Sequence, residues 1–327
     1  MVLGTHAVGD EGAAAFPLET ETTDPASGNG LDAEYYPLIG INQAHFVGLH
    51  TSSYSAEGLA PQIYFEWNII NELGDFEKLD VPILELALNI FIQRHLVFRS
   101  ILGDNGQMRC IAVPSYHVET CSDPLSVTRD RMTSGNLNPH VWPLFEFILT
   151  DTTPSSSILH VRISLFLLEA ISDLIFRQEL SSMYRAGRQS VGSMCERTAA
   201  MNSALPKIST VQFDRYSRHL SKNLYSSEQY KHSLQFWLSR LDTLASGPKF
   251  PVIPIGDKPN GEFLNQSIWL PADEWSALKS NCTFYGVTIP VVLLTVYALS
   301  IARWCGQSRF LVNVLVCLRH QGVFFNM

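Results

Sequence analysis

The sequence predicts an α/β fold, because segments with the two-residue period of β-strands alternate with segments that have the 3.6-residue period of α-helices. Hydrophobic residues make up 46% of the 327 residues and charged residues 17%, so the chain can bury a sizeable core. A chain of this length is expected to form two compact lobes. The sequence contains no internal repeat.

The first predicted elements follow a leader with few large apolar side chains. Residues 1–33 are rich in Gly, Ala, Thr, Asp and Glu, and are expected to form a disordered acidic leader or linker. Residues 61–68 alternate apolar and polar side chains, which is typical of a strand. Asp80 is suited to cap the amphipathic helix that follows, and Arg94 and His95 fall at the C-terminal end of that helix.

A hairpin, a strand and a second helix are predicted next. Asn105-Gly106 supplies the positive φ that a tight turn requires, so residues 101–113 are expected to form a hairpin. Residues 158–166 alternate apolar and polar side chains and predict another strand. Ser172 is suited to cap the following helix, which is expected to stop at Gly187.

Few aromatic residues occur between residues 187 and 222, and this stretch makes the best boundary between the two lobes. We therefore expect an N-terminal lobe over residues 34–205, and a linker with a second lobe over residues 206–327. The elements predicted after the boundary are a helix from Ser226 or Ser227, an extended proline-rich segment over residues 248–259, helices over residues 271–285 and 288–304, and a strand over residues 310–318.

Charge and composition exclude several classes of function. The net charge is -8, and no Lys or Arg precedes Lys78. The chain therefore lacks both a basic stripe for nucleic acid and the early positive charge of a secretory or mitochondrial address. The apolar runs over residues 158–176 and 288–302 are too charged or too short to span a bilayer. We expect a cytoplasmic protein that binds neither nucleic acid nor membrane.

Motifs for metal or nucleotide chemistry are also missing from the sequence. The six cysteines include no CxxC pair, so no metal site is expected. A Gly-rich phosphate loop, an HExxH pair and a G-x-S-x-G nucleophile turn are absent as well. The chain is therefore not expected to activate amino acids with ATP.

Two segments in the first third of the chain have the residue spacing of known sequence motifs. One runs from Tyr36 to Gly48 (YPLIGINQAHFVG) and the other from Arg94 to Gln107 (RHLVFRSILGDNGQ). They resemble the motifs FPLTxxQxAYxxGR and RHxxLRxxxxxDGxQ of the heterocyclisation (Cy) branch of nonribosomal peptide synthetase condensation domains. Segments that resemble later motifs of the same family follow in the family's order: Trp142–Glu146, Phe236–Leu241, the proline-rich stretch from Leu244 to Val252, Gly286–Pro290 and Phe310–Asn313.

The fold that this resemblance implies is a pair of chloramphenicol-acetyltransferase-like α/β lobes with an active-site tunnel between them. Because the chain ends at Met327, a few residues beyond the last matched motif, the second lobe is expected to be incomplete and the chain a truncated relative. The implied partners are peptidyl or acyl carrier proteins and other synthetase modules, which deliver thioester substrates on phosphopantetheine arms. No cofactor is expected to bind the chain directly.

The stretch that matches the catalytic motif of the Cy branch departs from it. The segment SLFLLEAIS corresponds to DxxxxDxxS, so Ser164 replaces the first Asp, Glu169 replaces the second, and Ser172 is kept. Leu165 occupies the position of the catalytic His of ordinary condensation domains. Ser164, Glu169 and Ser172 are therefore the candidate catalytic positions, although Ser164 cannot supply a carboxylate.

Other residues of the matched motifs are expected to have structural or tunnel-lining roles: Gln43, His45, Arg94, His95 and Arg99. The resemblance implies that Glu169 pairs with Arg94 or Arg99; the alternative is a surface Glu at the start of a helix. Gln43 is expected to bond to backbone or to contact substrate. His45 is expected to pack behind the first strand or to line the tunnel.

The sequence leaves three functions open. The first is a domain that joins a carrier-bound acyl group to a carrier-bound Cys, Ser or Thr and then closes a thiazoline or oxazoline ring. The second is a catalytically inactive relative that docks carrier proteins, or a decayed fragment. The third is a stand-alone acyltransferase of the same fold, which needs a catalytic His. His160 is either a substitute base or, as we favour, an ordinary hydrogen-bonded strand residue.

Overall fold

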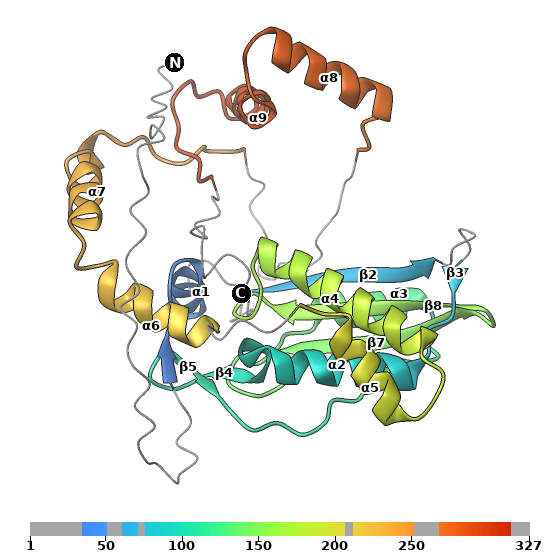
Figure 1. The fold of residues 1–327 in the computed structure, drawn as a ribbon. Helices are drawn as coiled ribbons and strands as arrows, with labels where there is room; N and C mark the ends of the chain where they lie inside the picture. The colour runs from blue at the N-terminus through green and yellow to red at the C-terminus, as the bar shows by residue number, and fades with distance from the viewer. Residues whose placement is uncertain (1–34, 51–60, 71–75, 207–211, 252–267, 315–327) are drawn as a thin grey trace.

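The computed structural model describes residues 35–50, 61–70, 76–206, 212–251 and 268–314 (Figure 1). The first elements are β1 (Tyr35–Pro37), α1 (Ile41–His50), β2 (Gln62–Ile70), β3 (Phe76–Glu77), α2 (Val81–Arg94), the 3-10 helix η1 (Leu96–Arg99), β4 (Ser100–Leu102), β5 (Gln107–Cys110), β6 (Glu119–Cys121), α3 (Leu125–Ser134), β7 (Phe145–Thr153), β8 (Ser156–Ser164), α4 (Ala170–Gln189) and α5 (Met194–Ser203). The later elements are α6 (Phe213–Asn223), α7 (Glu228–Leu238), the 3-10 helix η2 (Leu241–Thr243), α8 (Ala272–Phe284) and α9 (Ile289–Cys305). The predicted leader over residues 1–33 lies outside the described residues.

Two β-sheets organise the first part of the chain. The larger has the strand order β3-β2-β8-β7-β6, in which β6 and β7 are parallel and the other pairs antiparallel. Val161 of β8 lies opposite Phe65 of β2 and Phe147 of β7, which confirms the strands predicted around residues 61–68 and 158–166. The smaller sheet has the order β1-β5-β4 and contains the predicted hairpin, with Gly106 at a φ of 72° in its turn.

Helices α2 and α4 cover the apolar face of the larger sheet, and α5 packs against both of them (Figure 1). Asp80 caps α2 as predicted, because its side chain accepts a hydrogen bond from the backbone N–H of Ile83 at 3.1 Å. Phe176 of α4 meets Trp67 of β2 with ring centroids 5.3 Å apart and Phe91 of α2 at 5.1 Å. The alternating apolar side chains of the strands therefore meet the apolar sides of both helices in one core.

The opposite face of the larger sheet carries charged side chains and contacts α3. Arg162 of β8 is 6% exposed and pairs with Glu146 of β7, which also accepts a hydrogen bond from Arg131 of α3 at 2.8 Å. Glu66 of β2 accepts two hydrogen bonds from Arg129 of α3, at 2.6 and 2.9 Å. These ion pairs link α3 to the sheet; Arg162 is their buried arginine, whereas the side chains of Arg129 and Arg131 are 48% exposed.

Helix α4 begins and ends at residues other than those predicted. Its N-cap is Glu169, whose carboxylate accepts a hydrogen bond from the backbone N–H of Ser172 at 3.3 Å. The predicted Ser172 cap is therefore wrong, because Ser172 lies inside the first turn. The predicted stop at Gly187 is also wrong, because the helix continues past it. A Cβ at position 187 would lie 2.1 Å from Cε of Met201, so glycine there allows α5 to approach α4 closely.

The helices predicted in the second part of the chain are confirmed. Ser227 caps α7, since its hydroxyl accepts a hydrogen bond from the backbone N–H of Tyr230 at 3.1 Å. Helix α8 is followed by Gly286 at a φ of 65°, and α9 by Gly306 at a φ of 64°. Both glycines adopt the left-handed conformation that commonly ends helices.

Residues 310–314, the described part of the last predicted strand, do not form a strand. Their one backbone bond to another segment, within the residues that the structure describes, runs from the Leu311 N–H to the Ser246 carbonyl at 3.0 Å. A strand needs a ladder of such bonds, so the prediction is wrong for these residues. Residues 315–318 and most of the predicted proline-rich segment lie outside the described residues.

Helix α6 packs on the first part of the chain, although it follows the predicted lobe boundary at residues 205 and 206. The ring of Phe213 meets Tyr36 of β1 edge to face, with centroids 6.0 Å apart. The Ser217 hydroxyl donates a hydrogen bond to the carbonyl of Pro37, also in β1. The division into an N-terminal and a second lobe stays a prediction, but α6 contacts β1 and η1.

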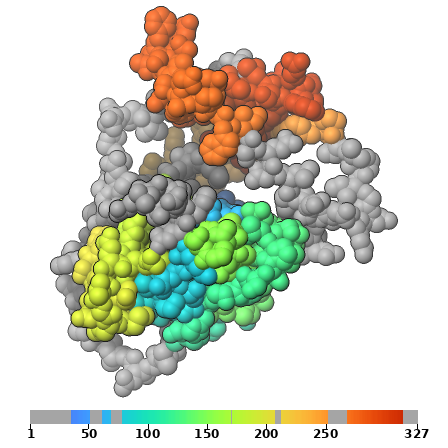
Figure 2. Space-filling view, turned by 90° about the vertical axis from the view of Figure 1, so that its right-hand side faces the viewer, coloured from blue at the N-terminus to red at the C-terminus, as the bar shows by residue number. Residues whose placement is uncertain are grey.

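Helices α8 and α9 contact each other and lie apart from the sheets (Figures 1 and 2). Their apolar side chains are largely exposed: the exposed fraction is 59% for Tyr297 and 73% for Trp304. Among the described residues, no single helix has the length and apolar character needed to cross a membrane. The α8–α9 pair, bent by 103°, meets these criteria only when both helices are taken together.

Candidate functional site

The stretch that matches the catalytic motif begins at the last residue of β8. Ser164 is fully buried, and its backbone N–H donates a hydrogen bond to the Leu144 carbonyl at 2.9 Å. Its hydroxyl donates to the Pro61 carbonyl at 3.5 Å and accepts from the Phe166 N–H at 3.3 Å. The Ser164 side chain therefore closes the turn after β8, and its hydroxyl is occupied by backbone groups.

The Glu169 carboxylate also accepts hydrogen bonds from backbone N–H groups. Besides the backbone N–H of Ser172, it accepts hydrogen bonds from the Ile171 N–H at 3.2 Å and from the Ser172 hydroxyl at 3.4 Å. These bonds satisfy N–H groups that the first turn of a helix leaves without partners. The second and third candidate catalytic positions, Glu169 and Ser172, thus lie together at the start of α4, where they stabilise the helix terminus.

Arg94 and His95 share the carboxylate of Glu179, a residue of α4. The Oε2 atom of Glu179 lies 3.1 Å from Arg94 Nε and 2.7 Å from His95 Nε2. The predicted pair between Glu169 and Arg94 is therefore wrong, because Glu179 supplies the negative charge. Glu169 is exposed at the start of its helix, in agreement with the alternative. The Arg99 pairing stays a prediction; Arg99 Nε is buried and has no hydrogen-bond partner among the described residues.

The Glu179 cluster consists of Arg94, His95 and Glu179; the sequence motifs include the first two residues and miss Glu179. Burial alone would raise the pKa of Glu179, but the hydrogen bond with His95 and the positive charges of His95 and Arg94 outweigh this and hold the pKa below its usual value. The available signal is that Glu179 lies on the buried side of α4, between Phe176 and Met183. An acidic residue on an apolar helix side predicts a basic partner.

Helix α1 lies over the turn that follows β8. The side-chain amide of Asn42 donates a hydrogen bond to the Phe166 carbonyl at 3.3 Å, and the ring of His45 meets the Phe166 ring edge to face at 6.1 Å. Burial lowers the pKa of His45, which favours the neutral imidazole. Gln43 donates a hydrogen bond to the Leu38 carbonyl at 3.0 Å, which is one of its two expected contacts.

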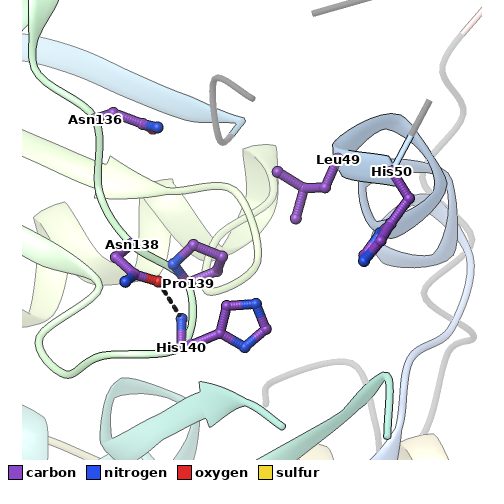
Figure 3. A pocket seen from close by; sticks show the side chains of 6 residues that line it. All are labelled: Leu49, His50, Asn136, Asn138, Pro139 and His140. Atoms are coloured by element: carbon purple, nitrogen blue, oxygen red, sulfur yellow. Dashed lines mark hydrogen bonds between the residues drawn. The ribbon is translucent and has the colours of Figure 1, made fainter. Parts of the chain in front are cut away.

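A pocket of about 360 Å³ lies between the C-terminal end of α1 and the loop before β7 (Figure 3). Its lining residues are Leu49, His50, Asn136, Asn138, Pro139 and His140. Each imidazole of the pocket bonds through Nδ1 to a backbone carbonyl at 2.9 Å, His50 to Phe46 and His140 to Leu102. Because a carbonyl oxygen can only accept, Nδ1 is the donor, and Nε2 of each neutral ring carries a lone pair.

Gln62 of β2 links the loop that lines the pocket to the strand position of Ser164. Gln62 lies opposite Ser164 in the register of β2 and β8. Its side chain accepts a hydrogen bond from the Leu137 N–H at 3.1 Å and donates one to the Gly135 carbonyl. Asn136, which lines the pocket, lies between these two residues.

The matched motifs do not include either pocket histidine. His140 comes just before the motif at Trp142–Glu146, and His50 comes just after the first motif, so adjacency to a motif is the available signal. Within the described part of the chain, no group of three or more His, Cys, Asp or Glu side chains is arranged to hold a metal ion. The chemistry that the two imidazoles offer is that of bases or hydrogen-bonding groups.

His160 is fully buried within the larger sheet. Its Nδ1 lies 2.8 Å from the hydroxyl of Tyr64, and that hydroxyl donates to Glu66 at 2.6 Å. Since the hydroxyl has a single proton, the His160 Nδ1–H is the donor to Tyr64. Burial lowers the pKa of His160 and keeps it neutral. His160 is therefore a hydrogen-bonded strand residue, which is the favoured alternative.

Replacement of Glu169 by alanine is expected to lower the free energy of unfolding by about 1 kcal/mol, the usual effect of losing an N-cap. Removal of the partner of a buried arginine would instead cost about 3–5 kcal/mol, so urea unfolding distinguishes the two roles. Glu169→Asp keeps a capping carboxylate and is the matched control, with stability expected near that of the wild type. A loss as large as that of a buried ion pair would contradict the capping assignment.

Known proteins similar to this chain agree with the motifs. A family model described as "Condensation domain" matches residues 143–326. The chain is 25% identical over 314 residues to bacitracin synthase 1 of Bacillus licheniformis, a match that covers 91% of the chain and 5% of that protein. It is 25% identical over 320 residues to phenyloxazoline synthase MbtB of Mycolicibacterium paratuberculosis, covering 92% of the chain and 24% of that protein. The chain thus spans less than a quarter of the length of either relative.

A solved structure with a similar fold is the cyclization-docking bidomain of the EpoB nonribosomal peptide synthetase from Sorangium cellulosum. The TM-score is 0.67 at 21% sequence identity, and the match covers 84% of this chain and 52% of that one. At this identity the likeness concerns the fold alone. It confirms the predicted chloramphenicol-acetyltransferase-like α/β fold class.

Proposed function

Because the chain belongs to the condensation-domain family of nonribosomal peptide synthetases, we propose that it joins a carrier-bound acyl group to a carrier-bound Cys, Ser or Thr and closes the product to a ring. The observation that carries this proposal is the family match over residues 143–326. The phenyloxazoline synthase among the relatives, and the cyclization domain among the similar folds, support ring closure in particular.

The proposed reaction has two steps. First, the amine of the downstream amino acid attacks the carbonyl carbon of the upstream thioester; a C–N bond forms, the C–S bond breaks, and the upstream arm leaves as a thiol. The side-chain thiol or hydroxyl then adds to the new amide carbonyl, and loss of water gives a thiazoline or oxazoline. Alignment of the two substrates supplies much of the rate. Proton transfer by a positioned group contributes about 10²–10⁴-fold more.

The proposed partners are peptidyl or acyl carrier proteins and other synthetase modules in the cytoplasm. Their phosphopantetheine arms carry both substrates, so the proposal requires no cofactor bound to this chain. Binding would have to bring two arms to one site, because each arm holds one half of the new amide.

A second candidate is a catalytically inactive relative that docks carrier proteins or is a decayed fragment. The observation that favours it is the use of the motif residues: the Ser164 hydroxyl is bonded to backbone, and the Glu169 carboxylate caps α4. In this case the fold would still present a surface to carriers, while no group at the motif positions would move a proton.

The test is an incubation of the full chain with an acyl-loaded carrier and a cysteinyl-loaded carrier, followed by mass spectrometry of both carriers. The proposal expects transfer of the acyl group to the second carrier, with a further loss of water when the ring closes. A carrier loaded with alanine is the control, because it can form the amide and cannot cyclise. Carrier binding without either product would support the inactive docking relative, and absence of both binding and product would contradict the proposed enzyme and support the decayed fragment.

A further inference from the structure

The motif positions of this chain offer no free group to accept a proton. The hydroxyl of Ser164 closes a turn and the carboxylate of Glu169 caps a helix. Leu165 stands where ordinary condensation domains have a His, and its side chain has no basic atom. If the proposed function holds, a base must come from another part of the site, and the following inference rests on that function.

The pocket between the end of α1 and the loop before β7 contains two imidazoles with a defined tautomer. The Nδ1–H groups of His50 and His140 both donate to backbone carbonyls, so that Nε2 is the basic nitrogen of each neutral ring. Both side chains line the same pocket, as Figure 3 shows. Its volume of about 360 Å³ falls in the ~300–1,000 Å³ range of small-molecule sites.

The loop that carries His140 is held more firmly than the end of α1. The Pro139 carbonyl accepts a hydrogen bond from the Leu102 N–H at 2.8 Å, and the His140 ring returns one to the Leu102 carbonyl. The His140 N–H donates in addition to Asn138 Oδ1 at 3.0 Å. His50, in contrast, is the last residue of α1, and its ring bonds within its own helix. A preorganised base needs little rearrangement during reaction, which favours His140.

His45 is another histidine near the motif stretch, and burial lowers the pKa of its imidazole. Its ring packs against the ring of Phe166 and is not part of the pocket lining. His160 is buried and bonded to Tyr64 in the sheet, so a substrate cannot reach it. Of the histidines near the motif stretch, His140 therefore combines a fixed basic nitrogen with access from a pocket.

We propose that His140 is the general base of the amide-forming step. As the substrate amine attacks the thioester carbonyl, Nε2 of His140 takes the proton that the amine nitrogen loses while the C–N bond forms. The C–S bond then breaks, and the imidazolium returns this proton to the leaving thiolate. One amide and one thiol result, and His140 is neutral again, so that no other reactant is consumed.

The experiment replaces His140 by asparagine in the full chain and measures amide formation between loaded carriers over a range of pH. The amide nitrogen of asparagine reaches the position of Nδ1 and keeps the bond to the Leu102 carbonyl, but it provides no base at the position of Nε2. We expect the rate to fall by about 10²-fold or more, with loss of the acid limb of the pH profile and partial rescue by added imidazole. The matched control is His117→Asn, whose side chain is 79% exposed and lies near Glu85, and which is expected to keep the wild-type rate.

The outcomes distinguish a failure of this proposal from a failure of the proposed function. A wild-type protein that forms product, at a rate and pH profile that His140→Asn shares, overturns the base and leaves the function intact. A wild-type protein that forms no product overturns both. A second measurement does not depend on the variant folding: long-range ¹⁵N–¹H correlation of the wild type is expected to show His140 protonated at Nδ1, and protonation of the neutral ring at Nε2 would overturn the proposal.

Discussion

Replacement of Glu179 by alanine is expected to lower the free energy of unfolding by about 3–5 kcal/mol, because it removes the carboxylate of the Glu179 cluster from beside Arg94, whose side chain is only 10% exposed. Glu179 itself is 8% exposed. The loss should therefore exceed that of a surface ion pair several times over. Urea unfolding at neutral pH measures it directly.

The effect of this substitution should depend on pH. Since the folded-state pKa of Glu179 is depressed, the carboxylate stabilises the fold at pH values above about 4.3, where a Glu of the unfolded chain is ionised. As the pH falls below that value, the unfolded chain takes up its proton first, and the stabilisation is lost through the folded-state pKa. The difference between wild type and variant is thus expected to be constant near neutrality and to shrink in acid.

The matched control for Glu179 is Glu228→Ala. Glu228 also accepts a hydrogen bond from a basic side chain, Lys231 at 2.6 Å, but its side chain is 88% exposed. Exposed ion pairs contribute about 0–1 kcal/mol, so this variant should unfold almost as the wild type does. If both variants lost the same free energy of unfolding, burial of the Glu179 cluster would make no contribution to stability.

Replacement of Phe176 by alanine is expected to lower the free energy of unfolding by about 3–5 kcal/mol, the range for a large aromatic in a closed core. Phe176 is fully buried, and its ring lies within 5.3 Å of Trp67 and 5.1 Å of Phe91, centroid to centroid. It also meets Phe147 of β7 at 6.1 Å. The residue therefore joins α4 to α2 and to the larger sheet, and its removal leaves a cavity that rigid neighbours cannot fill.

Phe284→Ala is the control for the loss of an aromatic ring as such. Phe284 is the last residue of α8 and is 82% exposed, so removing its ring creates no cavity. Its effect is expected to stay within about 0.5 kcal/mol. If the two substitutions lowered the melting temperature equally, Phe176 would not belong to a cooperative core.

Elements fixed by neighbours a few residues away are those that the sequence predicts correctly. Asp80 and Ser227 cap their helices through bonds to residues three positions on, and the Asn105-Gly106 turn depends on its own backbone. Such contacts are present in any conformation of the chain that forms the turn. They are therefore readable without knowledge of the rest of the fold.

Tertiary contacts explain the errors. Both Glu169 and Ser172 can cap a helix, and serine has the stronger preference, yet α4 is capped by Glu169, directly after the buried residues Phe166, Leu167 and Leu168. Gly187 looks like a helix stop, but its missing side chain makes room for α5. In each case a distant packing requirement overrides the local preference.

The candidate site shows the same limit. The motifs place Arg94 and His95 at the end of a helix, but their partner Glu179 lies on another helix far along the chain. The pocket with His50 and His140 arises because α1 and the loop before β7 meet, and no local pattern reports that meeting. The sequence thus predicts which segments belong to the site more reliably than which atoms face one another.

The contact between α6 and β1 has a consequence for any attempt to divide the chain. β1 is an outer strand of the smaller sheet. Two of its backbone carbonyls accept hydrogen bonds from α6: the Tyr35 carbonyl from the Arg218 guanidinium at 2.7 Å, and the Pro37 carbonyl from the Ser217 hydroxyl. A fragment cut at residue 205 would release both carbonyls and offer the strand to other molecules as a template for β-pairing. A fragment that ends at Asn223 would keep α6 on the edge strand β1. It is therefore the better fragment to isolate.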